Sequence, residues 1–95
     1  MKERIAVLEG IRTPLGKMNG AFKDYAPEDL GSVILRELLT RSPQYQDLIE
    51  EVIAGNVAQP AESMNIARVI SLRAGIKESV PAFTVHRNCA SGFEA

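Results

Sequence analysis

The sequence contains one cysteine, one histidine and no tryptophan in 95 residues. A single cysteine excludes an internal disulfide, and without further cysteines a Cys-rich zinc site is excluded as well. We therefore expect no bound metal and no bound cofactor. Cys89 acts either as a free thiol or as a small packing residue.

The chain also lacks an excess of charge of either sign and any long apolar run. Eleven basic residues stand against twelve acidic ones, and no cluster of lysine or arginine could follow a phosphate backbone. Charge interrupts the opening MKERIAVLEG before an apolar stretch reaches the roughly 7 to 15 residues of a signal sequence, and nothing approaches a membrane span of about 20. These features favour a cytoplasmic protein that binds neither nucleic acid nor a membrane.

What is present is the alternation of strands and helices that is typical of an α/β protein. The apolar run Ile5–Leu8, ended by Gly10 and Pro14, predicts a first strand that is buried on both faces. The segment 15–26 shows neither a helical nor a strand period, so we expect a surface loop there.

Two helices and two further strands are predicted after that loop. Pro27 suits the first position of a helix, and the apolar residues that follow recur at helical spacing up to residue 41. The later predicted elements are a turn or short helix after Ser42, a strand centred on 52–54, a helix from about 63 to 74 that Gly75 ends, a strand over 82–86 and a helix that begins at Asn88.

This order predicts a βαβαβ unit with a largely parallel sheet. With 45% hydrophobic residues, the length accommodates one domain with a modest core, over residues 1–95. The chain stops at Ala95, barely two turns into the last predicted helix, so we expect an incomplete N-terminal segment of a longer protein.

Cys89 lies at the predicted junction between the last strand and the last helix. Asn88 is available as N-cap, and the small residues Ala90, Ser91 and Gly92 leave room for a substrate. Elbow motifs expose a nucleophile at such a junction, where unpaired backbone N–H groups face the reacting atom. The alternative is that the cysteine is a buried, inert hydrophobe at the end of a strand.

A nucleophilic Cys89 needs a basic partner, because most of a free thiol is protonated at neutral pH and a helix dipole alone is too weak to ionise it. His86 is the only histidine of the chain. Residues three apart along a strand point to opposite faces, so we expect His86 to be a strand side chain and not the base.

Four segments together resemble the N-terminal part of the thiolases. They are IRTPLGKMNGAFKD, GNVAQPAESMNIAR, ESVPAFTV and NCASGFEA; they occur in the order and spacing of that family, and the similarity covers essentially all 95 residues. The resemblance implies that Cys89 takes an acyl group from an acyl-CoA as a thioester, and that its backbone N–H forms half of an oxyanion hole.

The resemblance further implies that the activating histidine, a second cysteine and the other half of the oxyanion hole belong to a C-terminal half that these 95 residues do not include. Coenzyme A thioesters would be the substrates, and the enzyme would be a homo-oligomer in which the edge strand Phe83–Val85 pairs with its twin. The segment alone would be inactive.

Other positions that match the thiolase segments are expected to be structural. Arg12 anchors a turn that Pro14 and Gly16 shape. Asn65 bonds near the start of its helix, and Arg68 pairs with a neighbouring carbonyl or carboxylate.

Two hypotheses follow. In the leading one, the chain is the acyl-accepting segment of an acyltransferase that condenses acyl-CoA or cleaves 3-ketoacyl-CoA by thiolysis. In the alternative, it is a non-catalytic module that binds a partner or oligomerises, with an inert buried cysteine.

Overall fold

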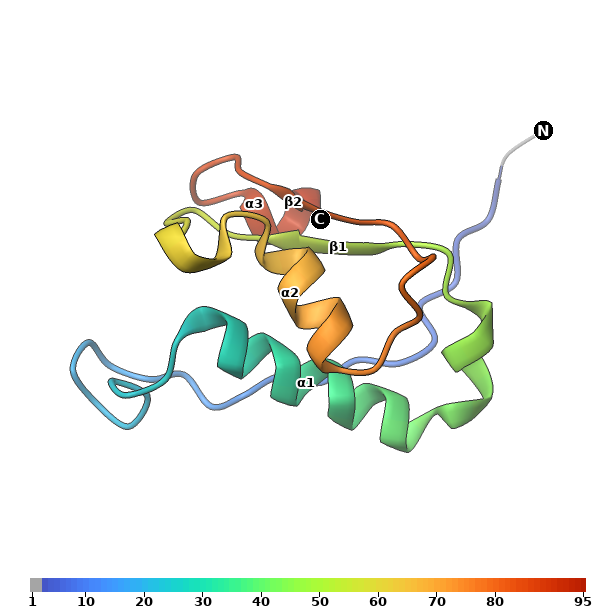
Figure 1. Ribbon diagram of the computed structural model, residues 1–95, viewed down its shortest axis with the longest axis horizontal. Coiled ribbons are helices and arrows are strands. Elements are labelled where there is room, and N and C mark those ends of the chain that lie inside the picture. Colours follow the sequence, from blue (N-terminus) through green and yellow to red (C-terminus); the bar gives the residue numbers. More distant parts are fainter. Residues whose placement is uncertain (1–2) are drawn as a thin grey trace.

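The computed structural model describes residues 3–95, and it confirms the α/β class (Figure 1). The elements are α1 (Pro27–Arg41), the 3₁₀ helix η1 (Pro43–Leu48), β1 (Val52–Gly55), the 3₁₀ turn η2 (Ala61–Ser63), α2 (Ile66–Arg73), β2 (Ala82–Val85) and α3 (Ser91–Glu94). No helix within the described residues is both long and apolar enough to cross a membrane.

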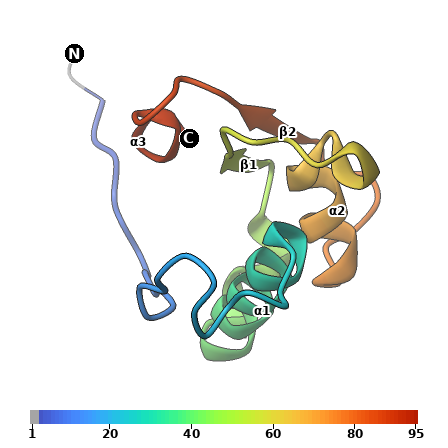
Figure 2. The ribbon, with the colours of Figure 1, turned by 90° about the vertical axis from the view of Figure 1, so that its left-hand side faces the viewer.

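The two strands pair in parallel, with Val52 opposite Ala82 and Gly55 opposite Val85. Backbone bonds extend the ladder at both ends, from the Val52 N–H to the Pro81 carbonyl at 3.0 Å and from the Asn56 N–H to the Val85 carbonyl at 3.1 Å. Helix α2 connects the strands and packs on both of them, while α1 packs on α2 (Figure 2). The β1–α2–β2 unit is therefore the parallel crossover that the sequence predicts.

The predicted first strand is wrong: segment Ile5–Leu8 is extended but pairs with no strand in the described part of the chain. Ile5 and Val7 are each 92% exposed, whereas a strand buried on both faces needs a hydrogen-bonding neighbour and two covering layers. Neither β1 nor β2 runs beside this segment (Figure 2). The observed sheet is the two-stranded β1–β2 unit and not βαβαβ.

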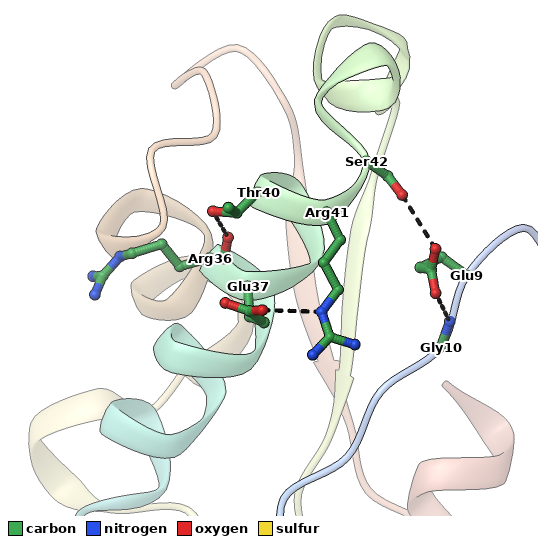
Figure 3. Close-up of polar contacts among 7 residues, drawn as sticks. All are labelled: Glu9, Gly10, Arg36, Glu37, Thr40, Arg41 and Ser42. Carbon is green, nitrogen blue, oxygen red and sulfur yellow. Dashed lines mark hydrogen bonds and ion pairs between the residues drawn. The ribbon is translucent and has the colours of Figure 1, made fainter.

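The N-terminal segment lies instead along the second half of α1. The Ser42 hydroxyl donates to the Glu9 carboxylate at 3.3 Å, and the Gly10 N–H donates to the same carboxylate at 3.4 Å (Figure 3). An apolar cavity of about 400 Å³ separates the segment from the helix; its walls include Val7, Leu8, Leu38 and Leu39. The segment thus faces α1 across this cavity, and its large apolar side chains remain exposed.

Helix α1 has the predicted bounds because both of its ends carry suitable residues. Pro27 occupies the first helical position, and the Asp29 carboxylate accepts the Ala26 N–H at 3.0 Å. In the last turn Arg41 pairs with Glu37 at 2.9 Å on the exposed face (Figure 3). An exposed pair of this kind contributes only about 0.3 to 0.5 kcal/mol, so the packed face decides where the helix lies.

Helix α2 starts three residues later than predicted, because a separate 3₁₀ turn occupies Ala61–Ser63. Its end is as predicted: Gly75 has a φ of +88°, its N–H donates to Leu72 at 3.2 Å, and the Ile76 N–H donates to Ser71 at 3.0 Å. These bonds form a Schellman motif, which needs a residue with positive φ at the position of Gly75.

The core is small and centres on α2. Ile66, Ala67, Ile70 and Ile76 are the buried apolar residues, and Gly31 of α1 allows close contact with Ile70. Many large apolar side chains remain at the surface, which is unusual for a monomeric protein.

Candidate active site

The site consists of the turn that joins β2 to α3. It differs from the prediction in one respect: Asn88 is not the N-cap of the last helix, because α3 begins at Ser91 with Ala90 as N-cap. Asn88 has a φ of +49°, a left-handed conformation that asparagine adopts more readily than most residues. The chain therefore makes a tight turn around Cys89 before the helix starts.

The backbone N–H groups of this turn are satisfied with one exception. The Arg87 N–H donates to the Ser91 hydroxyl at 2.7 Å and the Asn88 N–H donates to His86 Nδ1 at 3.1 Å. The Ala90 N–H donates to the Arg87 carbonyl at 3.0 Å, and the Ser91 N–H donates to the Asn88 carbonyl at 3.1 Å. Within residues 3–95 the Cys89 N–H alone in this turn has no acceptor.

Cys89 itself is exposed and forms no disulfide. Its thiol makes no hydrogen bond to any residue that the structure describes. The expectation of a buried cysteine at a strand end is therefore wrong for residues 3–95, because Cys89 is exposed there. Cys89 thus combines, within the described residues, an exposed thiol with a backbone N–H that has no acceptor.

His86 lies just beyond the end of β2 and is exposed. Its Nδ1 accepts the Asn88 N–H at 3.1 Å. No hydrogen bond joins His86 to Cys89 in the described structure. The histidine shapes the turn, and its exclusion as the base stays a prediction.

Gly55, the last residue of β1, contacts the backbone at the start of α3. A Cβ atom at Gly55 would lie 2.5 Å from the carbonyl carbon and oxygen of Ser91 and 2.7 Å from the nitrogen of Gly92. No side chain fits at such distances, so the start of α3 can rest on the strand only because residue 55 is glycine. Figure 1 shows α3 beside the end of β1.

One ion pair joins the turn to α3. Arg87 Nη1 lies 2.8 Å from the Glu94 carboxylate, and the two side chains are 66% and 45% exposed. Solvent screens such a pair, so it contributes about 1 kcal/mol or less. Within residues 3–95 no three His, Cys, Asp or Glu side chains are grouped as metal ligands.

The other residues singled out from the sequence lie away from Cys89 and make structural bonds. Arg12 donates to the Thr13 carbonyl at 3.0 Å, and Arg68 donates to the Val80 carbonyl at 3.0 Å. Asn65 donates to the Ala82 carbonyl at 3.1 Å, so its partner lies on β2 and not at the start of its own helix.

Two residues of the site were not recognised from the sequence. Ser91 was noted only as a small residue, and Gly55 was not singled out. The pattern Cys-x-Ser-Gly could have indicated the Ser91 hydroxyl, but the contact of Gly55 with Ser91 joins residues 36 positions apart and has no local signal.

The fold and the turn define a class: an α/β unit that presents an exposed cysteine between a strand and a helix. A family model described as "Thiolase, N-terminal domain" matches residues 5–95. The chain therefore belongs to the thiolase family, through its N-terminal domain.

Individual relatives agree with this assignment. A "Probable acetyl-CoA acyltransferase" of Staphylococcus epidermidis is 41% identical over 92 residues, which are 97% of this chain and 23% of that protein. The corresponding protein of Staphylococcus aureus is 38% identical over the same shares. This chain thus spans about a quarter of the length of the curated relatives it matches.

Solved structures show the same relationship. An acetyl-CoA acetyltransferase of Bacillus anthracis superposes with a TM-score of 0.80 at 34% identity, over 87% of this chain and 21% of that one. Human mitochondrial 3-ketoacyl-CoA thiolase, solved in complex with CoA, gives 0.79 at 35% identity, over 86% and 21%. The fold predicted from the resemblance is confirmed.

Proposed function

We propose that Cys89 is the acyl-accepting nucleophile of a thiolase-type acyltransferase and that this chain is its N-terminal segment. The observation that carries the proposal is the pairing, in one exposed residue, of a free thiol with the only unpaired N–H of the 87–91 turn. Membership of the thiolase family supports acyl-CoA as the substrate class.

In the proposed reaction the Cys89 thiolate attacks the carbonyl carbon of an acyl-CoA thioester. The new C–S bond pushes electrons onto the carbonyl oxygen, and the Cys89 N–H stabilises this oxyanion. When the carbonyl re-forms, CoA leaves as its thiolate and the acyl group remains on Cys89. The acyl-enzyme then serves condensation with a second acyl-CoA, or is formed in the reverse, thiolytic direction of fatty acid metabolism.

The described residues supply only part of this machinery. A thiol needs a base to become a nucleophile at neutral pH, and the one histidine accepts a backbone N–H at Nδ1. We propose that the base and the second oxyanion donor come from outside residues 3–95. We accordingly propose that the 95-residue chain alone does not turn over, since losing one oxyanion donor costs about 100- to 1000-fold.

Exposed apolar residues on β1, β2 and α3 bear on how the protein assembles. Ile53 and Phe83 are opposite each other in the β1–β2 register, and both are more than a third exposed. Phe93 of α3 is 98% exposed. Such apolar surface supports contact with further protein, and we propose a homo-oligomer in the cytoplasm that uses coenzyme A thioesters as substrates and binds no metal.

Steady-state assays of the protein that contains this segment test the proposal. Cys89→Ala is expected to abolish both acetoacetyl-CoA thiolysis and its reverse, whereas His86→Ala should keep most of the activity. Full activity of Cys89→Ala would refute the proposal, and loss of activity in His86→Ala with an intact fold would make His86 the base.

A further inference from the structure

We propose that Ser91 is a positioning residue whose hydroxyl directs the Cys89 N–H at the acyl oxygen. This inference rests on the proposed function, because the direction of that N–H matters only if Cys89 accepts an acyl group. Ser91 is 4% exposed, so it does not itself touch a substrate, and it acts through the backbone that precedes the cysteine.

The peptide between Asn88 and Cys89 sets the direction of this N–H. The Asn88 carbonyl and the Cys89 N–H belong to the same planar, trans peptide, so they point in opposite directions. The Ser91 hydroxyl donates to that carbonyl at 2.7 Å, and the Ser91 N–H donates to it at 3.1 Å. Holding the carbonyl toward α3 therefore turns the Cys89 N–H away from the helix.

The same hydroxyl also holds the peptide between His86 and Arg87. It accepts the Arg87 N–H at 2.7 Å, so one buried oxygen bridges the peptides on both sides of Arg87 and Asn88. This matters because Asn88 has a φ of +49°, and residues with a Cβ keep such a conformation only where their surroundings hold them. Ser91 provides three of the bonds that do so, two through its hydroxyl and one through its N–H.

Ser91 is in turn held by β1. The short distances from a Cβ at Gly55 to the Ser91 carbonyl show that the two backbones are in direct contact. Gly55 sits at the end of a strand whose register is set by four paired residues of β2. The sheet therefore fixes the orientation of the Cys89 N–H: Gly55 positions Ser91, and Ser91 positions the peptide that carries the N–H.

Two reactions of Cys89 separate this role from general support of the fold. Iodoacetamide alkylates a thiolate by displacement at a saturated carbon, and no oxyanion forms. p-Nitrophenyl acetate acylates it: the thiolate attacks the carbonyl carbon, the C–S bond forms, the ester C–O bond breaks, and p-nitrophenolate leaves with the electron pair. Only acylation passes through an oxyanion that the Cys89 N–H can stabilise.

The experiment measures both rate constants on the 95-residue chain and on Ser91→Ala. We expect the acylation rate constant, divided by the alkylation rate constant, to fall at least about tenfold, since loss of a whole donor costs about 100- to 1000-fold. Ser71→Ala is the matched control, because Ser71 is fully buried and its hydroxyl has no partner. An unchanged ratio in Ser91→Ala would overturn the proposal.

Gly55→Ala is a second variant. It keeps the Ser91 hydroxyl but disrupts the close contact between Ser91 and β1. The added Cβ must displace Ser91, so the same fall in the ratio is expected. Gly10→Ala is its control, because a Cβ there meets nothing within 4 Å. A normal ratio in a folded Gly55→Ala would contradict the role given to the strand.

Amide hydrogen exchange on the unmodified chain tests the geometry even if a variant fails to fold. The Arg87 amide, bonded to a buried hydroxyl, is expected to be protected, and the Cys89 amide is expected to exchange at the rate of an open backbone. Equal, fast exchange at both would overturn the proposal. Cys89→Ala separates the two ideas: if it is acylated as fast as the unmodified chain, the proposed function fails and not only the role of Ser91.

Discussion

Thr84 of β2 caps helix α2 directly and also bonds to Asn65. The Thr84 hydroxyl accepts the Ala67 N–H at 3.0 Å and donates to Asn65 Oδ1 at 2.9 Å. Asn65 occupies the N-cap position but makes no capping bond with its own side chain. The Ala67 N–H is therefore satisfied by a strand residue 17 positions further along the chain, whereas the side chain of the N-cap residue usually accepts such an N–H.

This relationship predicts a stability effect at Thr84. Thr84→Val keeps the shape but leaves the Ala67 N–H and Asn65 Oδ1 without their partner, so the free energy of unfolding should fall by about 1–3 kcal/mol. Urea denaturation measures it. Thr40→Val is the control, because its hydroxyl only back-bonds to Arg36 on an exposed helix face. A loss at Thr84 no larger than at Thr40 would disprove the capping role.

A second prediction concerns the end of α2. Gly75→Ala should lower the free energy of unfolding by about 1–2 kcal/mol, because its φ of +88° is unfavourable for a residue with a Cβ. A Cβ there meets nothing within 4 Å, so the cost lies in the backbone alone. Gly75→Asn should lose less than Gly75→Ala, and the opposite order in thermal unfolding would show that the Schellman turn does not hold.

A third prediction concerns self-association through β2. The bonds from Val52 to Pro81 and from Asn56 to Val85 fix the alternation of the parallel ladder, which turns the Thr84 N–H toward the outer edge. An apolar strand with an open edge favours pairing with a second copy. We expect light scattering to detect dimers at high micromolar concentration, with the Thr84 amide protected.

Phe83→Lys should shift this association toward monomer, because it places a charge on the exposed face of the edge strand. Lys77→Ala is a control, since Lys77 pairs with Asp47 outside both strands. A clean monomer of the unmodified chain, with rapid exchange at Thr84, would contradict the prediction.

The parts of the fold that depend on local signals were predictable from the sequence. Pro27 and Asp29 define the start of α1, and Gly75 defines the end of α2, because caps and stops act within a few residues. The strands around Ile53 and Phe83 were recognised for the same reason.

The errors arise where an element depends on neighbours. Ile5–Leu8 has the composition of a buried strand, but no strand beside it offers hydrogen bonds in residues 3–95. Asn88 has the chemistry of an N-cap, but the turn around Cys89 uses it at a positive φ and delays the helix to Ser91. Both outcomes depend on long-range contacts, which residue patterns alone do not record.

The most direct test of the central claim is to find where an acyl group attaches. The protein that contains this segment is exposed to acetyl-CoA, quenched in acid and cleaved with trypsin, which cuts after Arg87 and releases the peptide that starts at Asn88. The account predicts one acetyl group on that peptide, on Cys89, labile to hydroxylamine and absent from Cys89→Ala. An acetyl group on another residue, or none at all under conditions of measured turnover, would contradict it.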